Sequence, residues 1–268
     1  MPYADLDVGA LFYQDTGQEA GGDVGTATPT VLCIHGFCQS SAYWQATLDA
    51  VAAAGGRGIA PDLPAFGQSR GVAGPYTMEQ YADVLAALLD SLGLERVAVV
   101  GASMGGVIAQ QFALRHPSRV TRLMLVATGA FTGDPAGALK KADELAAGPW
   151  SDEMVRASTL AFFHTPPPEP VLRQFSEIYA NVSQAGAVEA LRSNVATNTF
   201  EQLANIAAPT LIVQGRHDRS RTPERGRAMC ERIPNCRLEI LEHSGHTPQI
   251  DEPAAFQQVA VPFLFGRA

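Results

Sequence analysis

Short, almost wholly apolar runs recur along the chain, and segments with a helical spacing of apolar residues lie between them. Runs of this kind, rich in Val, Ile and Leu, are typical of strands that are buried on both faces of a sheet. Their alternation with helices predicts a parallel sheet that helices cover on both sides. The runs span residues 30–34, 57–61, 96–100, 120–128, 209–215 and 236–241.

The clearest helical pattern covers residues 78–92, where apolar side chains repeat along one face. Thr77 and Gln80 have the spacing of a capping pair at its start, and Gly93 is suited to end it. This segment predicts a helix that packs against the sheet. Weaker patterns predict an N-terminal strand pair over residues 5–15 and a Gly-rich turn over residues 17–29. They also predict three further helices, over residues 42–54, 224–233 and 253–265.

The alternation of strands and helices is interrupted between residues 130 and 205. This segment has several helical patterns and a Pro-rich break at 165–170, but no convincing strand. We therefore expect a core domain of residues 1–129 and 206–268, with a helical cap of residues 130–205 inserted between two strands. Because the insertion follows a parallel strand, the cap should lie over the carboxyl edge of the sheet, where ligands bind in such folds.

Composition and charge limit the classes of partner. The 268 residues are 46% hydrophobic and 17% charged, and the formal net charge is −8 at pH 7. Nucleic acids and anionic membrane surfaces require clustered Lys and Arg, whereas the most basic stretch here, residues 215–227, is interleaved with acidic residues. We expect a small-molecule substrate as the partner of a monomer or homodimer, with no nucleic acid and no membrane.

Targeting signals and metal-type cysteine spacing are both missing from the sequence. The N-terminus lacks the charged and then apolar segments of a signal peptide. No apolar run reaches the roughly 18 residues that a membrane-spanning helix needs. The cysteines are expected to be reduced thiols in a cytoplasmic protein; they are Cys33, Cys38, Cys230 and Cys236.

A strand, a tight turn and a helix are predicted to meet at Ser103. The sequence there, Gly101-Ala102-Ser103-Met104-Gly105, matches the pattern G-x-S-x-G. Strand and helix approach closely at such a turn, so the residues on either side of its tip must lack bulk. The start of the helix also places backbone N–H groups beside the hydroxyl. Ser103 is therefore the candidate nucleophile.

Two residues on later loops have the chemistry that a serine nucleophile needs. A Ser hydroxyl requires a base, and the base requires an orienting acid. Asp218 follows the apolar run 209–215, and His246 follows the run 236–241, at the same edge of the sheet as Ser103. The order Ser, acid, His is the one expected for this sheet topology.

An oxyanion hole needs two backbone N–H donors near the nucleophile. One donor is the N–H of Met104, the residue that follows Ser103. The other is expected at Phe37, because His35-Gly36 would turn the chain after the first apolar run and direct this N–H toward the same pocket.

These segments together resemble the α/β-hydrolase fold superfamily over residues 31–265, apart from the insertion. The matching stretches are HGF (35–37), PDLPAFGQS (61–69), GASMGG (101–106), GRHD (215–218) and SGHTPQIDEP (244–253). The resemblance implies a mostly parallel sheet of about eight strands, with helices on both faces and a helical cap. It also implies that Ser103 is the nucleophile, Asp218 the acid and His246 the base. The N–H groups of Phe37 and Met104 would form the oxyanion hole.

The resemblance also indicates which branches of the superfamily the chain is similar to. Relatives similar to dehalogenases and epoxide hydrolases carry an Asp nucleophile, where this chain has Ser103. The SMGG motif with a cap resembles the branch of C–C bond hydrolases, enol-lactonases and small-ester esterases, and it also occurs in cofactor-free perhydrolases. C–C hydrolases usually follow the catalytic His with Trp, whereas Thr247 follows His246 here.

Three functions remain open from the sequence. The first is a serine hydrolase that cleaves an ester, lactone or thioester of a small, largely apolar metabolite through an acyl-enzyme. The second is a C–C bond hydrolase or lyase, and the third is a ligand-binding or biosynthetic protein that keeps the triad but turns over slowly. The sequence contains no metal cluster, P-loop or dinucleotide fingerprint, so no cofactor or metal is expected. The pocket is expected to be lined by Phe37, Phe131, Phe162 and His164.

Overall fold

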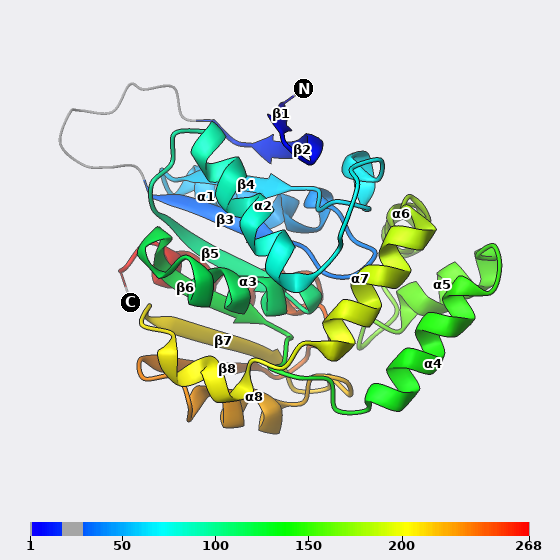
Figure 1. Cartoon of the computed structure of the whole chain (residues 1–268). Coiled ribbons are helices and arrows are strands. Elements are labelled where there is room, and N and C mark those ends of the chain that lie inside the picture. The colour runs from blue at the N-terminus through cyan, green and yellow to red at the C-terminus, as the bar shows by residue number, and fades with distance from the viewer. Residues whose placement is uncertain (1, 18–28, 268) are drawn as a thin grey trace.

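The computed structural model describes residues 2–17 and 29–267, so the Gly-rich turn predicted at 17–29 lies almost wholly outside the described residues. An eight-stranded sheet with the order β1-β2-β4-β3-β5-β6-β7-β8 forms its centre (Figure 1). The β1–β2 and β2–β4 pairs are antiparallel, and the remaining pairs are parallel. The strands are β1 (Tyr3–Leu6), β2 (Gly9–Asp15), β3 (Thr30–Ile34), β4 (Arg57–Pro61), β5 (Val97–Ala102), β6 (Val120–Val126), β7 (Thr210–Gly215) and β8 (Cys236–Leu241).

Helices cover both faces of this sheet, as the alternation of patterns predicts (Figure 1). On one face lie α2, α3 and α8, and on the other lie α1 and α10. The predicted helix at 42–54 consists of two elements, the 3-10 turn η1 and α1. The bounds are η1 (Ser41–Trp44), α1 (Gln45–Ala53), η2 (Gly67–Ser69), α2 (Met78–Ser91), α3 (Met104–Arg115), η3 (Pro117–Arg119), α8 (Pro223–Cys230), α9 (Pro248–Asp251) and α10 (Pro253–Leu264).

Strand β5 shows why the sheet has continuous apolar runs. All 6 of its residues are buried. Val97 and Val99 belong to the apolar cluster under α2 and α3, whereas Ala98 and Val100 belong to the cluster on the opposite face. Because successive side chains of a strand point to opposite faces, a strand between two layers of helices is apolar at every position.

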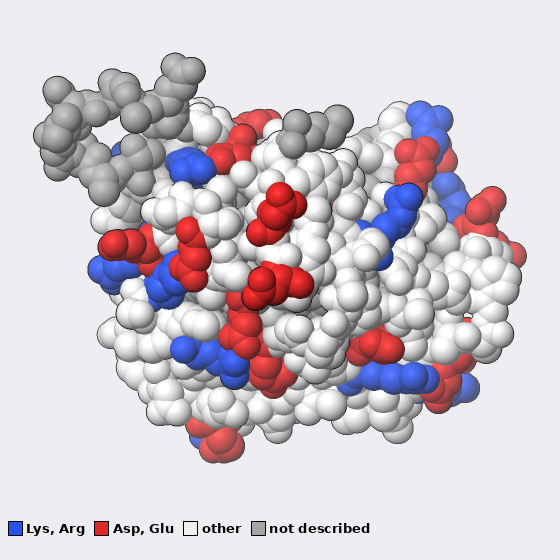
Figure 2. Space-filling model, turned by 45° about the horizontal axis from the view of Figure 1, so that its top comes forward, with Lys and Arg blue, Asp and Glu red and all other residues white. Residues whose placement is uncertain are grey.

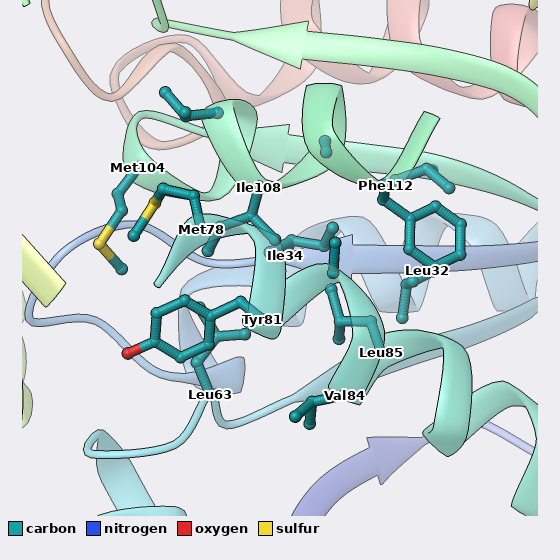
Figure 3. Close-up of a cluster of buried hydrophobic side chains, with 14 of the residues drawn as sticks. Leu32, Ile34, Leu63, Met78, Tyr81, Val84, Leu85, Met104, Ile108 and Phe112 are labelled. Carbon is teal, nitrogen blue, oxygen red and sulfur yellow. The ribbon is translucent and has the colours of Figure 1, made fainter. Parts of the chain in front are cut away.

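Helix α2 confirms the strongest helical prediction. Its N-terminal residue is preceded by Thr77, whose hydroxyl accepts a hydrogen bond of 3.1 Å from the Gln80 N–H. Gly93, with φ of 64°, follows the helix in the left-handed conformation that favours glycine. Figure 3 shows apolar side chains of α2 facing those of β3 and α3 in one cluster, including Met78, Tyr81, Leu85, Leu32, Ile34, Met104, Ile108 and Phe112.

Four helices between β6 and β7 stand apart from the layers that cover the sheet (Figure 1). In the first pair α4 contacts α7, and in the second α5 contacts α6. An isolated β-bridge between Phe66 and Val182 connects this group to the loop after β4. The bounds are α4 (Pro135–Ala146), α5 (Asp152–Leu160), α6 (Glu169–Ala180) and α7 (Gln184–Ala196), followed by the 3-10 turn η4 (Phe200–Asn205).

Acidic and basic side chains are interspersed on the face of the molecule seen in Figure 2. Several surface arginines pair with carboxylates, for example Arg115 with Asp83 at 2.6 Å and Arg232 with Glu201 at 2.7 Å. Among the described residues, no helix is long and apolar enough to cross a bilayer. Neither nucleic acid nor membrane binding is tested by these features, and their absence as partners stays a prediction.

The cysteines differ from the sequence-based expectation. Cys230 at the end of α8 and Cys236 at the start of β8 form a disulfide, so the prediction of reduced thiols is wrong for this pair. The short turn between the helix and the strand brings their Cα atoms to 5.3 Å, within the usual range for a disulfide. Cys33 and Cys38 are free and buried.

Candidate active site

Ser103 occupies the tip of the turn between β5 and α3. Its backbone has φ of 53° and ψ of −117°, a conformation that is strained for a residue other than glycine. Strain of this kind persists only where the surrounding structure enforces it, and it is concentrated at functional sites. The turn directs the Ser103 side chain away from both the strand and the helix.

The glycines around Ser103 are required by close contacts, with backbone at Gly101 and Gly105 and with the Thr128 side chain at Gly106. A Cβ atom on Gly105 would lie 2.3 Å from the Ile34 carbonyl oxygen, and one on Gly101 would lie 2.2 Å from the Gly105 carbonyl oxygen. A Cβ atom on Gly106 would lie 2.5 Å from the Thr128 Cβ. The structure thus confirms that the small residues of this motif let strand and helix approach closely.

Hydrogen bonds hold the backbone of Ser103 in place. Its N–H donates to the Val126 carbonyl at 2.9 Å, and its own carbonyl accepts from the Thr128 hydroxyl at 2.7 Å. Both partners come from the end of β6 and the loop behind it. Since these bonds use only the backbone of residue 103, the hydroxyl group remains available for a different partner.

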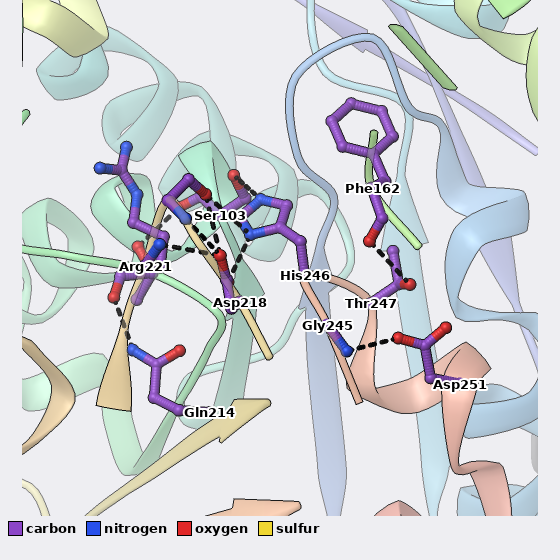
Figure 4. Close-up of polar contacts among 11 residues, drawn as sticks. Ser103, Phe162, Gln214, Asp218, Arg221, Gly245, His246, Thr247 and Asp251 are labelled. Carbon is purple, nitrogen blue, oxygen red and sulfur yellow. Dashed lines mark hydrogen bonds and ion pairs between the residues drawn. The ribbon is translucent and has the colours of Figure 1, made fainter. Parts of the chain in front are cut away.

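That partner is His246 (Figure 4). The His246 Nε2 atom lies 2.9 Å from the Ser103 Oγ atom, and its Nδ1 atom lies 2.6 Å from the Asp218 Oδ2 atom. The neutral tautomer with its proton on Nδ1 fits both contacts, because Nδ1–H then donates to the carboxylate and Nε2 accepts from the hydroxyl. The structure therefore brings together the three residues that the sequence predicts from the turn after β5 and the loops after β7 and β8.

The second carboxylate oxygen of Asp218 is held separately. Its Oδ1 atom accepts from the N–H groups of Ser220 and Arg221, each at 2.8 Å, and from the Ser220 hydroxyl at 3.0 Å. Burial alone would raise the pKa of Asp218, but the charge of His246 and the hydrogen bonds from His246, Arg221 and Ser220 outweigh burial and lower this pKa below its ordinary 3.8. Asp218 thus stays ionised at neutral pH.

The lowered pKa of Asp218 predicts how it contributes to stability. A carboxyl group with a folded-state pKa below its unfolded value stabilises the fold above the unfolded pKa and loses that contribution as pH falls through the folded pKa. The difference in unfolding free energy between the wild type and Asp218→Asn should therefore shrink between about pH 5 and pH 3. Urea unfolding across this range measures it, and a constant difference would contradict the pKa assignment.

The two expected oxyanion donors are the N–H of Met104, which follows Ser103 in the chain, and the N–H of Phe37 in the loop after β3. A Cβ atom on Gly36 would lie only 3.3 Å from the Ser103 Cβ, so the loop after β3 runs directly beside the hydroxyl. His35 supports this loop, because its Nδ1 atom contacts the Gly36 carbonyl at 2.8 Å and its Nε2 atom accepts from the Leu63 N–H at 2.9 Å. In the part of the chain that the structure describes, no group accepts a hydrogen bond from the Phe37 N–H or from the Met104 N–H.

An aromatic group connects the loop after β3 with the inserted helices. The Phe37 ring contacts Tyr179 of α6 with a centroid distance of 6.3 Å, and Tyr179 contacts Trp150 at 5.5 Å and Phe162 at 6.3 Å. The sequence does not predict the contact between Phe37 and Tyr179. Helical periodicity reveals that α6 has an apolar face, but it does not reveal what that face contacts.

The predicted pocket residues differ in where the structure places them. Phe162 stacks on the His246 ring with a centroid distance of 5.9 Å, and Phe37 follows Gly36 in the loop that passes beside Ser103. His164 instead stacks on His217, with centroids 3.8 Å apart. The structure does not bring Phe131 to this group, because its ring is 42% exposed and packs against Phe200 in η4.

A cavity of about 600 Å³ reaches the site between residues 160–164 and the loop that carries Asp218. It contacts His246 and Asp218, but Ser103 is not among the residues that line it. The cavity is therefore an opening on the side of the base and acid. It is lined by Leu160, Ala161, Phe162, Phe163, His164, His217, Asp218, Arg219, Ser220, Gly245 and His246.

No group of three or more His, Cys, Asp or Glu side chains suited to a metal ion occurs in the part of the chain that the structure describes. The Ser103 hydroxyl contacts the His246 imidazole, and that imidazole contacts the Asp218 carboxylate. Such a set supports nucleophilic and acid–base chemistry by the protein itself.

Comparison with known proteins agrees with this fold. Residues 29–253 match the family described as the alpha/beta hydrolase fold, which is more than half of the chain, so the chain belongs to the α/β-hydrolase family. The predicted fold class is thereby confirmed.

Relatives within the family are named after different substrates. The chain is 28% identical over 257 residues to a 2-hydroxy-6-oxononadienedioate/2-hydroxy-6-oxononatrienedioate hydrolase of Cupriavidus pinatubonensis, covering 90% of this chain and 89% of the relative. It is 29% identical to a second protein of the same name from Pseudomonas putida, with 90% of each covered. Among solved structures, the enol-lactonase of Burkholderia xenovorans matches with a TM-score of 0.88 and 25% identity, covering 98% of this chain and 100% of the other.

Proposed function

We propose that this protein is a serine hydrolase that cleaves an ester, lactone or thioester of a small, largely apolar metabolite through an acyl-enzyme. The observation that carries the proposal is the pair of contacts made by His246, 2.9 Å to the Ser103 hydroxyl and 2.6 Å to the Asp218 carboxylate. A hydroxyl in this arrangement has a base within reach, and the base has an orienting acid.

In the proposed reaction, His246 takes the proton of Ser103 as the Ser103 oxygen attacks the acyl carbon. The negative charge that develops on the carbonyl oxygen is stabilised by the N–H groups of Phe37 and Met104. His246 then donates its proton to the leaving group, and a water molecule activated by the same imidazole releases the acyl group from Ser103. Asp218 holds the imidazole and balances its charge throughout.

We propose that residues 130–205 form a cap over the core domain of residues 1–129 and 206–268, and that this cap selects the substrate. Its support is the aromatic group that joins the two parts, in which Tyr179 contacts Phe37 and Phe162 contacts His246. Aromatic rings around a few convergent polar groups are typical of pockets for small organic ligands. A largely apolar acyl or alcohol group fits this lining.

A second candidate function is C–C bond hydrolysis. It is favoured by the relatives of 28% and 29% identity named as 2-hydroxy-6-oxononadienedioate hydrolases. In such a reaction His246 would move protons on the vinylogous diketone, and Ser103 would have a lesser part. Against it stands Thr247, which occupies the position after His246 where the branch of C–C hydrolases usually has Trp.

Turnover of substrates of both classes tests whether the protein hydrolyses esters or C–C bonds. We expect p-nitrophenyl acetate or butyrate, a thioester or a lactone to be hydrolysed with kcat/KM of about 10⁴ M⁻¹s⁻¹ or more for the best of them. A 2-hydroxy-6-oxodienoate serves as the comparison, followed by its loss of absorbance. Turnover of the dienoate without ester turnover would establish the second function. Covalent labelling of Ser103 without turnover of either class would favour a binding or biosynthetic protein.

A further inference from the structure

A buried hydroxyl holds the peptide unit that follows the nucleophile. The Ser103 carbonyl and the Met104 N–H belong to one planar peptide unit, so they point in opposite directions. The Ser103 carbonyl accepts from the Thr128 hydroxyl at 2.7 Å. It also accepts from the Gly106 N–H at 3.0 Å and from the Val107 N–H at 3.3 Å, at the start of α3. Because these donors hold the carbonyl end, the Met104 N–H is directed away from them.

The Thr128 hydroxyl is committed to this hydrogen bond. A hydroxyl has a single proton to donate, and Thr128 is fully buried. The other acceptor near it, the Gly129 carbonyl, is 3.5 Å away and already accepts from the Gln110 side chain at 3.2 Å. A Cβ atom on Gly106 would lie 2.6 Å from the Thr128 Oγ1 atom. The absence of a side chain at Gly106 therefore makes room for this hydroxyl beside the first turn of α3.

Two fully buried glutamines hold the loop that carries Thr128. Gln214 of β7 donates to the Thr128 carbonyl at 2.9 Å. Gln110 of α3 donates to the carbonyl of the next residue, Gly129, and to the Gly106 carbonyl at 3.1 Å. Because Gln110 connects this loop with the first turn of α3, the position of Thr128 relative to the helix is fixed.

The other expected oxyanion donor is held in the same way. The Gly36 carbonyl and the Phe37 N–H share a peptide unit, and the Gly36 carbonyl contacts the His35 Nδ1 atom at 2.8 Å. Since the Leu63 N–H donates to His35 Nε2, the proton of the neutral ring lies on Nδ1 and is donated to this carbonyl. At both peptide units a fully buried side chain thus bonds the carbonyl, while no described group accepts from the N–H.

We propose that Thr128 is a positioning residue for the oxyanion hole, because its hydroxyl fixes the peptide unit that supplies the Met104 N–H. The hydrogen bond orients this peptide unit. It also strengthens the N–H as a donor, since hydrogen bonds in a chain polarise one another. Thr128 acts through Met104 and does not touch the substrate. The proposal rests on the proposed function, in which negative charge develops beside this N–H.

Amide NMR of the full chain tests the positioning without a substrate. Thr128→Val removes the hydroxyl and keeps the branched shape, and it should shift the amide proton and nitrogen resonances of Met104. The variant should fold, because the Ser103 carbonyl keeps its two N–H donors from α3. Thr128→Ser keeps a hydroxyl and should leave these resonances near their wild-type positions.

The matched control is Thr210→Val. Thr210 is also buried, and its hydroxyl donates to the Ala208 carbonyl at 2.9 Å, but it lies at the start of β7, at the opposite edge of the sheet from Ser103. This variant should leave the Met104 resonances unchanged. Unchanged Met104 resonances in Thr128→Val, or an equal shift in Thr210→Val, would overturn the proposal.

Kinetics provide the second readout. Thr128→Val should lower kcat on the best ester by roughly tenfold with little change in KM, less than the loss of about a hundredfold or more that follows removal of a whole oxyanion donor. Thr128→Ser should recover most of the loss, and Thr210→Val should keep the wild-type kcat. Wild-type kcat in Thr128→Val would overturn the proposed effect on the reaction.

Inhibition by a trifluoromethyl ketone reports on the oxyanion hole itself. The Ser103 oxygen adds to the ketone carbon, its proton passes to His246, and the ketone oxygen becomes an oxyanion. The inhibition constant should rise in Thr128→Val by about the factor by which kcat/KM falls. An unchanged inhibition constant would contradict a role of Thr128 in the hole. If the wild type hydrolyses no ester, the proposed function fails, while the Met104 resonances still decide the positioning.

Discussion

Replacing Ser103 by Ala should lower kcat on any ester substrate by a factor of roughly 10³ to 10⁶. The variant loses only the hydroxyl that lies 2.9 Å from His246 Nε2. The fold should be retained, because the bonds that hold the turn use the backbone of residue 103, to Val126 and Thr128. Steady-state kinetics and urea unfolding measured side by side separate the loss of chemistry from a loss of structure.

Ser91→Ala is the matched control for this substitution. Among the described residues, the Ser91 hydroxyl bonds only the Leu88 carbonyl, at 2.8 Å within α2, and contacts none of the candidate catalytic residues. Its removal should leave kcat unchanged. Wild-type turnover in Ser103→Ala would show that the protein does not use an acyl-enzyme on this residue.

Replacing Asp218 by Asn should lower kcat by about 10⁴, as the corresponding change does in other triads. The two backbone N–H groups and the Ser220 hydroxyl that surround Oδ1 require an oxygen atom there. The amide oxygen will therefore occupy that position, and the NH₂ group will face His246 Nδ1 in place of Oδ2. This favours the tautomer with its proton on Nε2, which cannot accept the proton of Ser103.

The control for this second variant is Ser220→Ala, which removes one hydrogen bond to Oδ1 and a 3.4 Å contact with His246 Nδ1 but leaves the carboxylate in place. Its kcat should fall by less than about tenfold, the effect of one modest hydrogen bond. KM should change little in Asp218→Asn, because the acid does not touch the substrate. A kcat in Asp218→Asn within tenfold of the wild type would show that another group orients the imidazole.

The turn and the triad could be predicted from the sequence because their determinants are local or follow from topology. Gly101 and Gly105 report a close approach of strand and helix, which the structure shows as backbone contacts shorter than a Cβ atom tolerates. Asp218 and His246 each follow a run of strand type, and parallel strands end at one edge of a sheet. The order of the strands in the sheet then brings Asp218 and His246 close to Ser103.

The surroundings of the triad could not be predicted in the same way. Which aromatic ring of the insertion meets His246 depends on how α4–α7 pack, and amphipathic spacing does not specify a partner. Phe162 and Phe131 look alike in the sequence, yet one stacks on His246 and the other is 42% exposed. Asp251 resembles an ordinary acidic residue before a helix, and its hydrogen bond from the Gly245 N–H becomes visible only in the folded structure.

The disulfide between Cys230 and Cys236 could not be predicted from the sequence for a related reason. Cys230 and Cys236 lie on a helix and a strand, and their proximity depends on the turn between those elements. The 6-residue separation of the two cysteines is not a metal-ligand spacing, and in the sequence it does not indicate a disulfide either. Tertiary geometry decides the pairing, as it does for the contacts of Asp251.

Covalent labelling by a fluorophosphonate, mapped by mass spectrometry of peptides, tests the central claim most directly. The account predicts one phosphonyl group per chain, attached to Ser103 and absent from Ser103→Ala. Labelling should be slowed by orders of magnitude in His246→Ala, because the hydroxyl then has no base. A label on another residue, or equal labelling rates with and without His246, would contradict the assignment of Ser103 and His246 as nucleophile and base.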